Sequence, residues 1–113
     1  GCMDLQIKVE DKYLIIYLTG PVDARSAREV EESLERIISY HQEKDIIISL
    51  ADVRYMSSSG LRIFISLKNN LIDTTQKLKL CALSEPVSRV FDVTRVSELF
   101  DIFETEAEAI KDY

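Results

Sequence analysis

The chain has 113 residues, of which 46% are hydrophobic and 30% are charged, the composition of one globular domain with its own core. Its 20 acidic and 14 basic residues give a formal net charge of −6, which argues against nucleic acid as a partner because phosphate neutralisation needs clustered Lys and Arg. No apolar run approaches the roughly 18 residues of a membrane span, and no signal peptide is visible. We therefore expect a single domain over residues 4–111, a cytoplasmic monomer that binds neither nucleic acid nor membrane.

Two cysteines, Cys2 and Cys81, are too few for a disulfide framework or a metal site. Cys81 lies in an apolar run over residues 78–83, so we expect it to be a small buried side chain. The sequence therefore predicts no metal ion and no cofactor.

The first part of the chain predicts a hairpin followed by a helix. Residues 5–9 alternate apolar and polar, residues 13–19 are rich in Ile, Leu and Tyr, and the short link between them favours antiparallel strands. Ser26 and Glu29 have the spacing of a capping box, in which each side chain binds the other residue's backbone N–H. The helix that follows has one apolar stripe, formed by Ala27, Val30, Leu34, Ile37 and Ile38.

In the rest of the chain, strands alternate with helices. The continuous apolar run 45–50 is typical of a strand that is covered on both faces. We expect a helix from about Leu61, strands over 77–83 and 100–103, a helix from Ser84–Pro86, and a terminal helix opened by a capping box at Thr105 and Glu108. This order predicts an α/β fold with a mixed sheet of four to five strands, mostly parallel after the antiparallel hairpin, packed with about four helices.

A run of three serines and a glycine, Ser57–Gly60, lies between the apolar strand and the next helix. Hydroxyls are favoured at a helix cap, and Gly60 lets the backbone turn there without a Cβ clash. A phosphate on one of these serines would sit at a helix N-terminus, which favours anions. Arg62 is four residues beyond Ser58 and could flank such a phosphate, although a free surface side chain is an equally good interpretation.

Catalysis by these serines is not expected. A serine hydrolase needs a positioned base, and the sole histidine, His41, follows a polar helix end where a solvated or capping role suits it better. The run also lacks the Gly-x-Ser-x-Gly elbow, and no phosphate-binding Gly-rich loop is present. The sequence therefore predicts a binding protein and not an enzyme.

Three segments resemble the STAS domain family, and within it the bacterial anti-sigma factor antagonists. They are residues 20–23 (Gly-Pro-Val-Asp), residues 50–61 around the serines, and residues 86–91 (Pro-Val-Ser-Arg-Val-Phe). The resemblance extends from about Leu5 to Ile110.

The resemblance implies a switch protein. Its unphosphorylated form would bind an anti-sigma factor, a Ser/Thr kinase with a GHKL-type ATP fold, and so release the sigma factor. The kinase would then phosphorylate the antagonist, and a PP2C-type phosphatase would reset it. The position of the family's acceptor serine matches Ser58, and its acidic loop residue matches Asp23, which by itself is equally well a turn carboxylate. The expected partner surface comprises Asp23, Ser57, Ser59, Gly60 and Arg62.

The sequence departs from the family pattern at Ser57, which stands where the family usually has Asp. Three outcomes are open: modification of Ser58, modification of Ser57 instead, or partner binding without phosphorylation. We favour Ser58, because its position relative to Gly60 is unchanged, with Ser57 as the alternate. The rival interpretation is a STAS scaffold or accessory subunit of a larger regulatory or transport complex.

Overall fold

The computed structural model describes residues 4–113, so Gly1 and Cys2 lie outside the described part. The strands are β1 (Asp4–Val9), β2 (Tyr13–Thr19), β3 (Asp45–Asp52), β4 (Leu78–Cys81) and β5 (Asp101–Phe103). The helices are α1 (Ala27–Ser39), α2 (Ser58–Leu71), α3 (Glu85–Val93) and α4 (Glu106–Ala109), with a 3₁₀ turn, η1 (Val96–Leu99), before β5. Within residues 4–113, no helix is long and apolar enough to cross a membrane.

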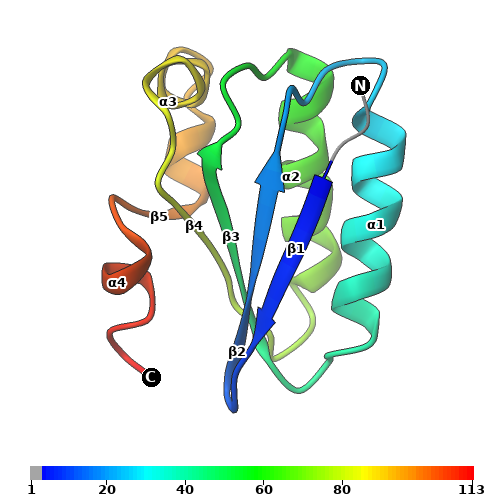
Figure 1. Ribbon diagram of the computed structural model, residues 1–113, viewed down its shortest axis with the longest axis vertical. Coiled ribbons are helices and arrows are strands. Elements are labelled where there is room, and N and C mark those ends of the chain that lie inside the picture. The colour runs from blue at the N-terminus through cyan, green and yellow to red at the C-terminus, as the bar shows by residue number, and fades with distance from the viewer. Residues whose placement is uncertain (1–3) are drawn as a thin grey trace.

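The five strands form one sheet in the order β1-β2-β3-β4-β5. β1 and β2 pair in antiparallel fashion through the hairpin, and all later neighbours are parallel. Figure 1 shows the sheet in front of α2, with α1 beside α2 and with α4 on the β4–β5 side, away from α1. Because β3 and β4 are parallel, the loops that follow them emerge at the same edge of the sheet.

The main core lies between the sheet and the helices α1, α2 and α3. Even-numbered residues of β2 and β3, such as Ile16 and Ile48, point into it and are fully buried. Val30 and Leu34 of α1 and Phe64 of α2 pack against them, as the helical periodicity of these residues requires. This core fixes where each helix begins relative to the strand before it.

A smaller core lies on the second face of the sheet. Ile15, Ile47 and Cys81 are fully buried there against Ala109 of α4. The apolar run 45–50 is therefore covered on both faces, and Cys81 is buried, as predicted.

The α/β prediction is confirmed: the sheet is mixed, its parallel part follows the antiparallel hairpin, and α1 to α4 pack on it. Some boundaries differ. β4 occupies residues 78–81 and is shorter than expected, because Ala82 adopts a left-handed φ of 58° that ends the strand. The turn η1 was not predicted, since its four residues carry no periodic signal.

The capping box predicted at Ser26 is wrong. The Ser26 side chain makes no cap bond to α1; its hydroxyl accepts a hydrogen bond from Asp23 N–H at 3.1 Å and donates one to the Pro21 carbonyl at 3.0 Å. At the start of α4 the Thr105 hydroxyl does accept a bond from Glu108 N–H at 3.1 Å. The Glu108 carboxylate accepts in turn from the Thr105 hydroxyl, at 3.4 Å, and not from the Thr105 N–H as a capping box requires.

Truncating a side chain of the main core should destabilise the protein strongly. Ile48 is fully buried, so Ile48→Ala should lower the free energy of unfolding by about 2–5 kcal/mol. Ile72 is 70% exposed, so Ile72→Ala should change it by less than about 0.5 kcal/mol. Urea titration followed by circular dichroism measures both, and equal losses would contradict the assignment of the core.

Candidate functional site

Two loops are joined side by side at one edge of the sheet. The first follows β2 and contains Val22, and the second follows β3 and contains Met56; these two residues form an isolated parallel β-bridge. The Val22 N–H donates to the Tyr55 carbonyl at 3.0 Å, and the Ser57 N–H donates to the Val22 carbonyl at 3.0 Å. The start of α2 is therefore held against the loop that contains Asp23.

Gly60 lies where this loop and α2 come closest. A Cβ atom at Gly60 would be 2.4 Å from the Val22 carbonyl oxygen and 2.8 Å from Val22 Cγ1. Gly60 lies inside α2 and its backbone is not in the left-handed region, so our prediction that it relieves a turn was wrong. Its role is to let backbone approach backbone.

Ser57 is the N-cap of α2. Its backbone is extended, with φ −88° and ψ 175°, and its hydroxyl accepts a hydrogen bond from Gly60 N–H at 3.2 Å. The helix therefore begins at Ser58, three residues earlier than the Leu61 start that we predicted. The hydroxyl of Ser57 is thus engaged in satisfying one of the orphan donors of the first turn.

Ser58 is the first residue of α2 and is exposed to solvent. The backbone N–H groups of Ser58 and Ser59 lie in the first turn, where the helix itself provides no acceptor. The macrodipole is positive at this end, so an anion at Ser58 is favoured by about 0.3–1 kcal/mol at an exposed position. Ser58 is the most accessible of the three hydroxyls, since Ser57 and Ser59 are half-buried.

Asp23 forms the turn that precedes α1. Its Oδ1 accepts hydrogen bonds from the N–H groups of Ser26 at 3.1 Å and Arg25 at 3.0 Å. These bonds, the one from Ser26 foremost, hold the pKa of Asp23 below its usual value, so the carboxylate is charged at neutral pH. Asp23 therefore has the turn role considered from the sequence, and because it directly follows Val22 it also lies beside the start of α2.

Arg62 and Ser59 are placed on a groove between α1 and α2. This groove has a volume of about 700 Å³ and is also lined by Arg28 and Glu31 of α1. Arg62 is exposed, and none of the ion pairs found within residues 4–113 involves it. Arg28 is paired with Glu32 at 3.2 Å, which leaves Arg62 as the cation on this groove that has no carboxylate at its guanidinium.

The sequence did not reveal the residues that join the loops. Val22 and Met56 lie in two of the segments that carry the family resemblance and are both buried, but their pairing joins parts of the chain that are far apart and has no local signal. Ser84 was predicted only as a helix start, but its hydroxyl donates to the Val53 carbonyl at 2.6 Å and so ties the loop after β4 to the loop after β3. Tyr55, 56% exposed, was not among the predicted site residues and lies directly before Met56.

The profile of the STAS domain family matches residues 4–109 of the chain. The chain belongs to the STAS domain family. It is 31% identical over 111 residues to the anti-sigma-B factor antagonist of Listeria monocytogenes, covering 94% of this chain and 95% of that protein. The structure superposes on an anti-sigma factor antagonist of Mycobacterium paratuberculosis with a TM-score of 0.87, at 18% identity and with 98% and 93% of the two chains covered.

A second structural neighbour of this STAS domain is the Bacillus cell fate determinant SpoIIAA in its phosphorylated form. The TM-score is 0.70 at 20% identity, over 98% of each chain. The resemblance inferred from the three sequence segments is thereby confirmed at the level of family and fold. The relatives are regulatory binding proteins and not enzymes, and within residues 4–113 of this STAS domain no group of three His, Cys, Asp or Glu side chains could hold a metal ion.

Gly60→Ala should destabilise the STAS domain, which is opposite to the usual effect of replacing a helical glycine by alanine. The new Cβ would push on the Val22 carbonyl, and overpacking of this kind costs about 1–3 kcal/mol. Asn69→Ala, at an exposed position of the same helix, is the matched control and should stay within about 0.5 kcal/mol. Urea titration measures both, and a stabilised Gly60→Ala protein would contradict the close approach.

Ser57→Ala should remove the cap of α2 and cost about 0.5–2 kcal/mol, whereas Ser57→Asp should keep most of the stability because Asp is as good an N-cap as Ser. Ser58→Ala removes an exposed hydroxyl one residue further on and should cost far less than Ser57→Ala. Thermal unfolding of the three variants measures this order. Equal losses for Ser57→Ala and Ser58→Ala would show that Ser57 does not cap the helix.

Proposed function

We propose that this STAS domain is an anti-sigma factor antagonist whose binding is controlled by phosphorylation of Ser58. In its unmodified form it binds an anti-sigma factor, and the sigma factor is released. The observation that carries the proposal is the division of roles among the serines: the Ser57 hydroxyl is engaged as a helix cap, while the Ser58 hydroxyl is exposed on the first turn of α2. A protein of the same fold exists in a phosphorylated form, which supports the class of modification.

The choice of Ser58 over Ser57 follows from the hydrogen bonds. A kinase that modified Ser57 would have to reach an oxygen that is half-buried and already accepts the bond from Gly60 N–H, next to the place where α2 meets Val22. A phosphoryl group on Ser58 projects into solvent from a helix N-terminus that favours anions. Ser58 is thus the acceptor for which modification leaves the fold of the resting protein intact.

The departure from the family pattern at Ser57 does not count against this proposal. Asp and Ser are among the preferred N-cap residues, because each places an oxygen where it accepts an N–H of the first turn. Ser57 does this for Gly60. The replacement therefore preserves the cap of α2, so the change from Asp to Ser at position 57 is compatible with the same local structure.

The negative charge of the phosphate explains how phosphorylation of Ser58 would weaken binding of the partner. A phosphoserine adds about −1.5 to −2 charges at neutral pH to a chain whose formal charge is already −6. If the partner covers Ser58 closely, an uncompensated buried charge costs about 2–5 kcal/mol, which corresponds to about 30-fold to several-thousand-fold weaker binding. No refolding of this domain is needed, since the switch acts at the interface.

The proposed partner surface surrounds Ser58. It comprises the predicted residues Asp23, Ser57, Ser59, Gly60 and Arg62. To these we add Tyr55, because tyrosine is, with tryptophan and arginine, among the residues enriched where interfaces gain most binding energy, and Tyr55 is 56% exposed beside the serines. The backbone of the buried Gly60 would contribute by letting α2 and the Val22 loop form one continuous surface.

The chemistry of phosphorylation belongs to the partner. We propose that the anti-sigma factor is a GHKL-type Ser/Thr kinase, that a PP2C-type phosphatase removes the phosphate, and that the exchange takes place in the cytoplasm on a monomeric antagonist. The Ser58 Oγ attacks the γ-phosphorus of ATP, its proton passes to a base of the kinase, and ADP leaves with Mg²⁺ held by the kinase. This chain contributes only a correctly placed hydroxyl.

The proposal predicts one phosphate per chain, on Ser58. Incubation of the protein with its cognate anti-sigma kinase and Mg²⁺-ATP, followed by mass spectrometry, should show a single phosphoserine. Ser58→Ala should abolish the modification. Ser59→Ala is the matched control, because it removes the neighbouring hydroxyl of the same turn and should leave the modification of Ser58 in place.

Two results would contradict the proposal. If the Ser58→Ala protein were phosphorylated to the same extent on Ser57, the acceptor would be Ser57, and its role as the N-cap of α2 would not prevent its modification. Absence of phosphoserine in protein purified from its native host under all growth conditions, together with binding to the anti-sigma factor, would instead favour a constitutive scaffold.

A further inference from the structure

The second face of the sheet is covered by one short segment, residues 104–113, which we call the strap. It contains α4 and follows β5, and Figure 1 shows it on the β4–β5 side of the molecule, away from α1. Ala109 is the residue of the strap that is fully buried. It packs on an apolar strip of three fully buried side chains that belong to the strands, Ile15, Ile47 and Cys81.

A buried lysine anchors the strap to the sheet. Lys79 of β4 is only 7% exposed, and its Nζ donates a hydrogen bond to the Ala109 carbonyl at 2.9 Å. The ammonium lies 4.4 Å from the ring centroid of Tyr113 and 5.3 Å from that of Phe103, both within the range of cation–π attraction. None of the ion pairs found within residues 4–113 includes Lys79. Two of its three supporting groups therefore belong to the strap.

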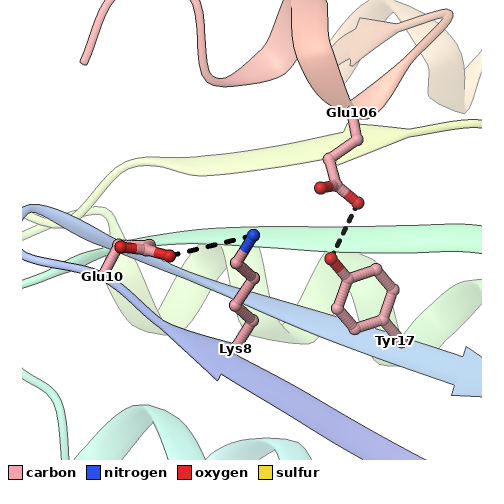
Figure 2. A network of polar contacts seen from close by, with 4 residues as sticks. All are labelled: Lys8, Glu10, Tyr17 and Glu106. Carbon is pink, nitrogen blue, oxygen red and sulfur yellow. Dashed lines mark hydrogen bonds and ion pairs between the residues drawn. The ribbon is translucent and has the colours of Figure 1, made fainter.

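Two tyrosine hydroxyls add further anchors. Tyr113 donates to Asp45 Oδ2 at 2.5 Å, and its ring stacks on Tyr13 at a centroid distance of 4.9 Å. Tyr17 donates to Glu106 Oε1 at 2.8 Å, and Figure 2 shows this bond on the same side of the β1–β2 hairpin as the Lys8–Glu10 ion pair. Burial and the Glu106 carboxylate raise the pKa of Tyr17 to about 12, so its hydroxyl remains a donor at neutral pH.

The balance of these contacts favours an easily opened segment. Most side chains of the strap are exposed; its one fully buried side chain is an alanine, which buries little apolar area, and Ile110 packs on the apolar strip while only half-buried. The anchors are mainly polar. When the strap closes, each polar group exchanges a hydrogen bond to water for one within the protein, so each bond adds only a small net stability to the closed form. Closing the strap also removes the Lys79 ammonium from water without giving it a carboxylate, which opposes closure.

We infer that the strap opens as a unit while the sheet and α1 to α3 stay folded. Opening hydrates Lys79 and exposes the apolar strip, so the second face exists in a closed and an open form. The inference is independent of the proposed function. The strap covers the second face of the sheet, whereas Ser58 lies at the edge of the sheet where the loop after β3 leads into α2.

The thiol of Cys81 reports on this opening. Cys81 is fully buried under the closed strap, and burial raises the pKa of its thiol, so it reacts slowly. In a Cys2→Ser protein it is the remaining thiol of the chain. With Ellman's reagent in excess, the Cys81 thiolate displaces one nitrothiobenzoate anion and forms a mixed disulfide, and the released anion is followed by its absorbance. Opening of the strap alone predicts a labelling rate that rises weakly with urea below the unfolding transition, because little surface is exposed.

Tyr113→Phe in the Cys2→Ser protein should raise the labelling rate by about tenfold, since it removes a hydrogen bond to a carboxylate. Tyr40→Phe is the matched control, because Tyr40 is 76% exposed, and it should leave the rate unchanged. Tyr17→Phe, which removes the bond to Glu106, should act in the same direction as Tyr113→Phe. Far-UV circular dichroism of all variants should match the parent.

The inference is overturned if labelling of Cys81 in the parent shows the full urea dependence of global unfolding. It is also overturned if neither tyrosine variant of the strap differs from Tyr40→Phe. Neither result bears on phosphorylation of Ser58, whose test uses the kinase.

Discussion

The site depends on the contact between the Val22 carbonyl and the first turn of α2. The Val22 carbonyl accepts a hydrogen bond from Ser57 N–H at 3.0 Å, and a Cβ on Gly60 would be 2.4 Å from the same oxygen. This close approach fixes the start of α2 against the loop after β2. The loop with Val22 follows β2, and the start of α2 follows β3. The register in which β2 and β3 pair therefore determines how the loop and the helix lie relative to each other.

Within that frame the serines are not equivalent. Ser57 is engaged with the backbone of its own helix, Ser59 lines the groove beside Arg62, and Ser58 is the exposed hydroxyl between them. The start of α2 at Ser58 places this hydroxyl in the first turn, where the free backbone N–H groups and the helix dipole are closest. A protein that is to be modified by another needs an accessible acceptor on a rigid support, and the first turn of a packed helix provides both.

Much of the fold could be predicted from local patterns. The continuous apolar run of β3 and the stripe of α1 each predicted the correct element, because burial on one face or two leaves a periodic pattern in the sequence. The alternation in β1 also predicted a strand, although Ile7 and Val9 of that strand are 43% and 46% exposed. The prediction failed where the decisive contact is non-local or where two motifs compete. Ser26 has the spacing of a capping box, but Asp23 takes the N–H groups of the turn and the Ser26 hydroxyl turns back to Pro21.

The candidate site shows the same division. The position of Ser58 could be proposed from the motif, but the reason for Gly60 could not, because Val22 approaches it from another loop. The buried Lys79 was likewise hidden in the strand pattern, since its environment is supplied by Tyr113, Phe103 and the Ala109 carbonyl from distant parts of the chain. On both faces of the sheet, the features that could not be predicted from the sequence are therefore contacts between separate elements.

We propose that charge at position 58 sets the affinity of this STAS domain for the anti-sigma factor. Protein carrying phosphoserine at position 58, made by co-translational incorporation or ligation, can be compared with unmodified protein by isothermal titration against the same anti-sigma factor. We expect the phosphorylated protein to bind at least about 30-fold more weakly, with both proteins equally folded. Equal affinity of the two folded proteins would contradict it.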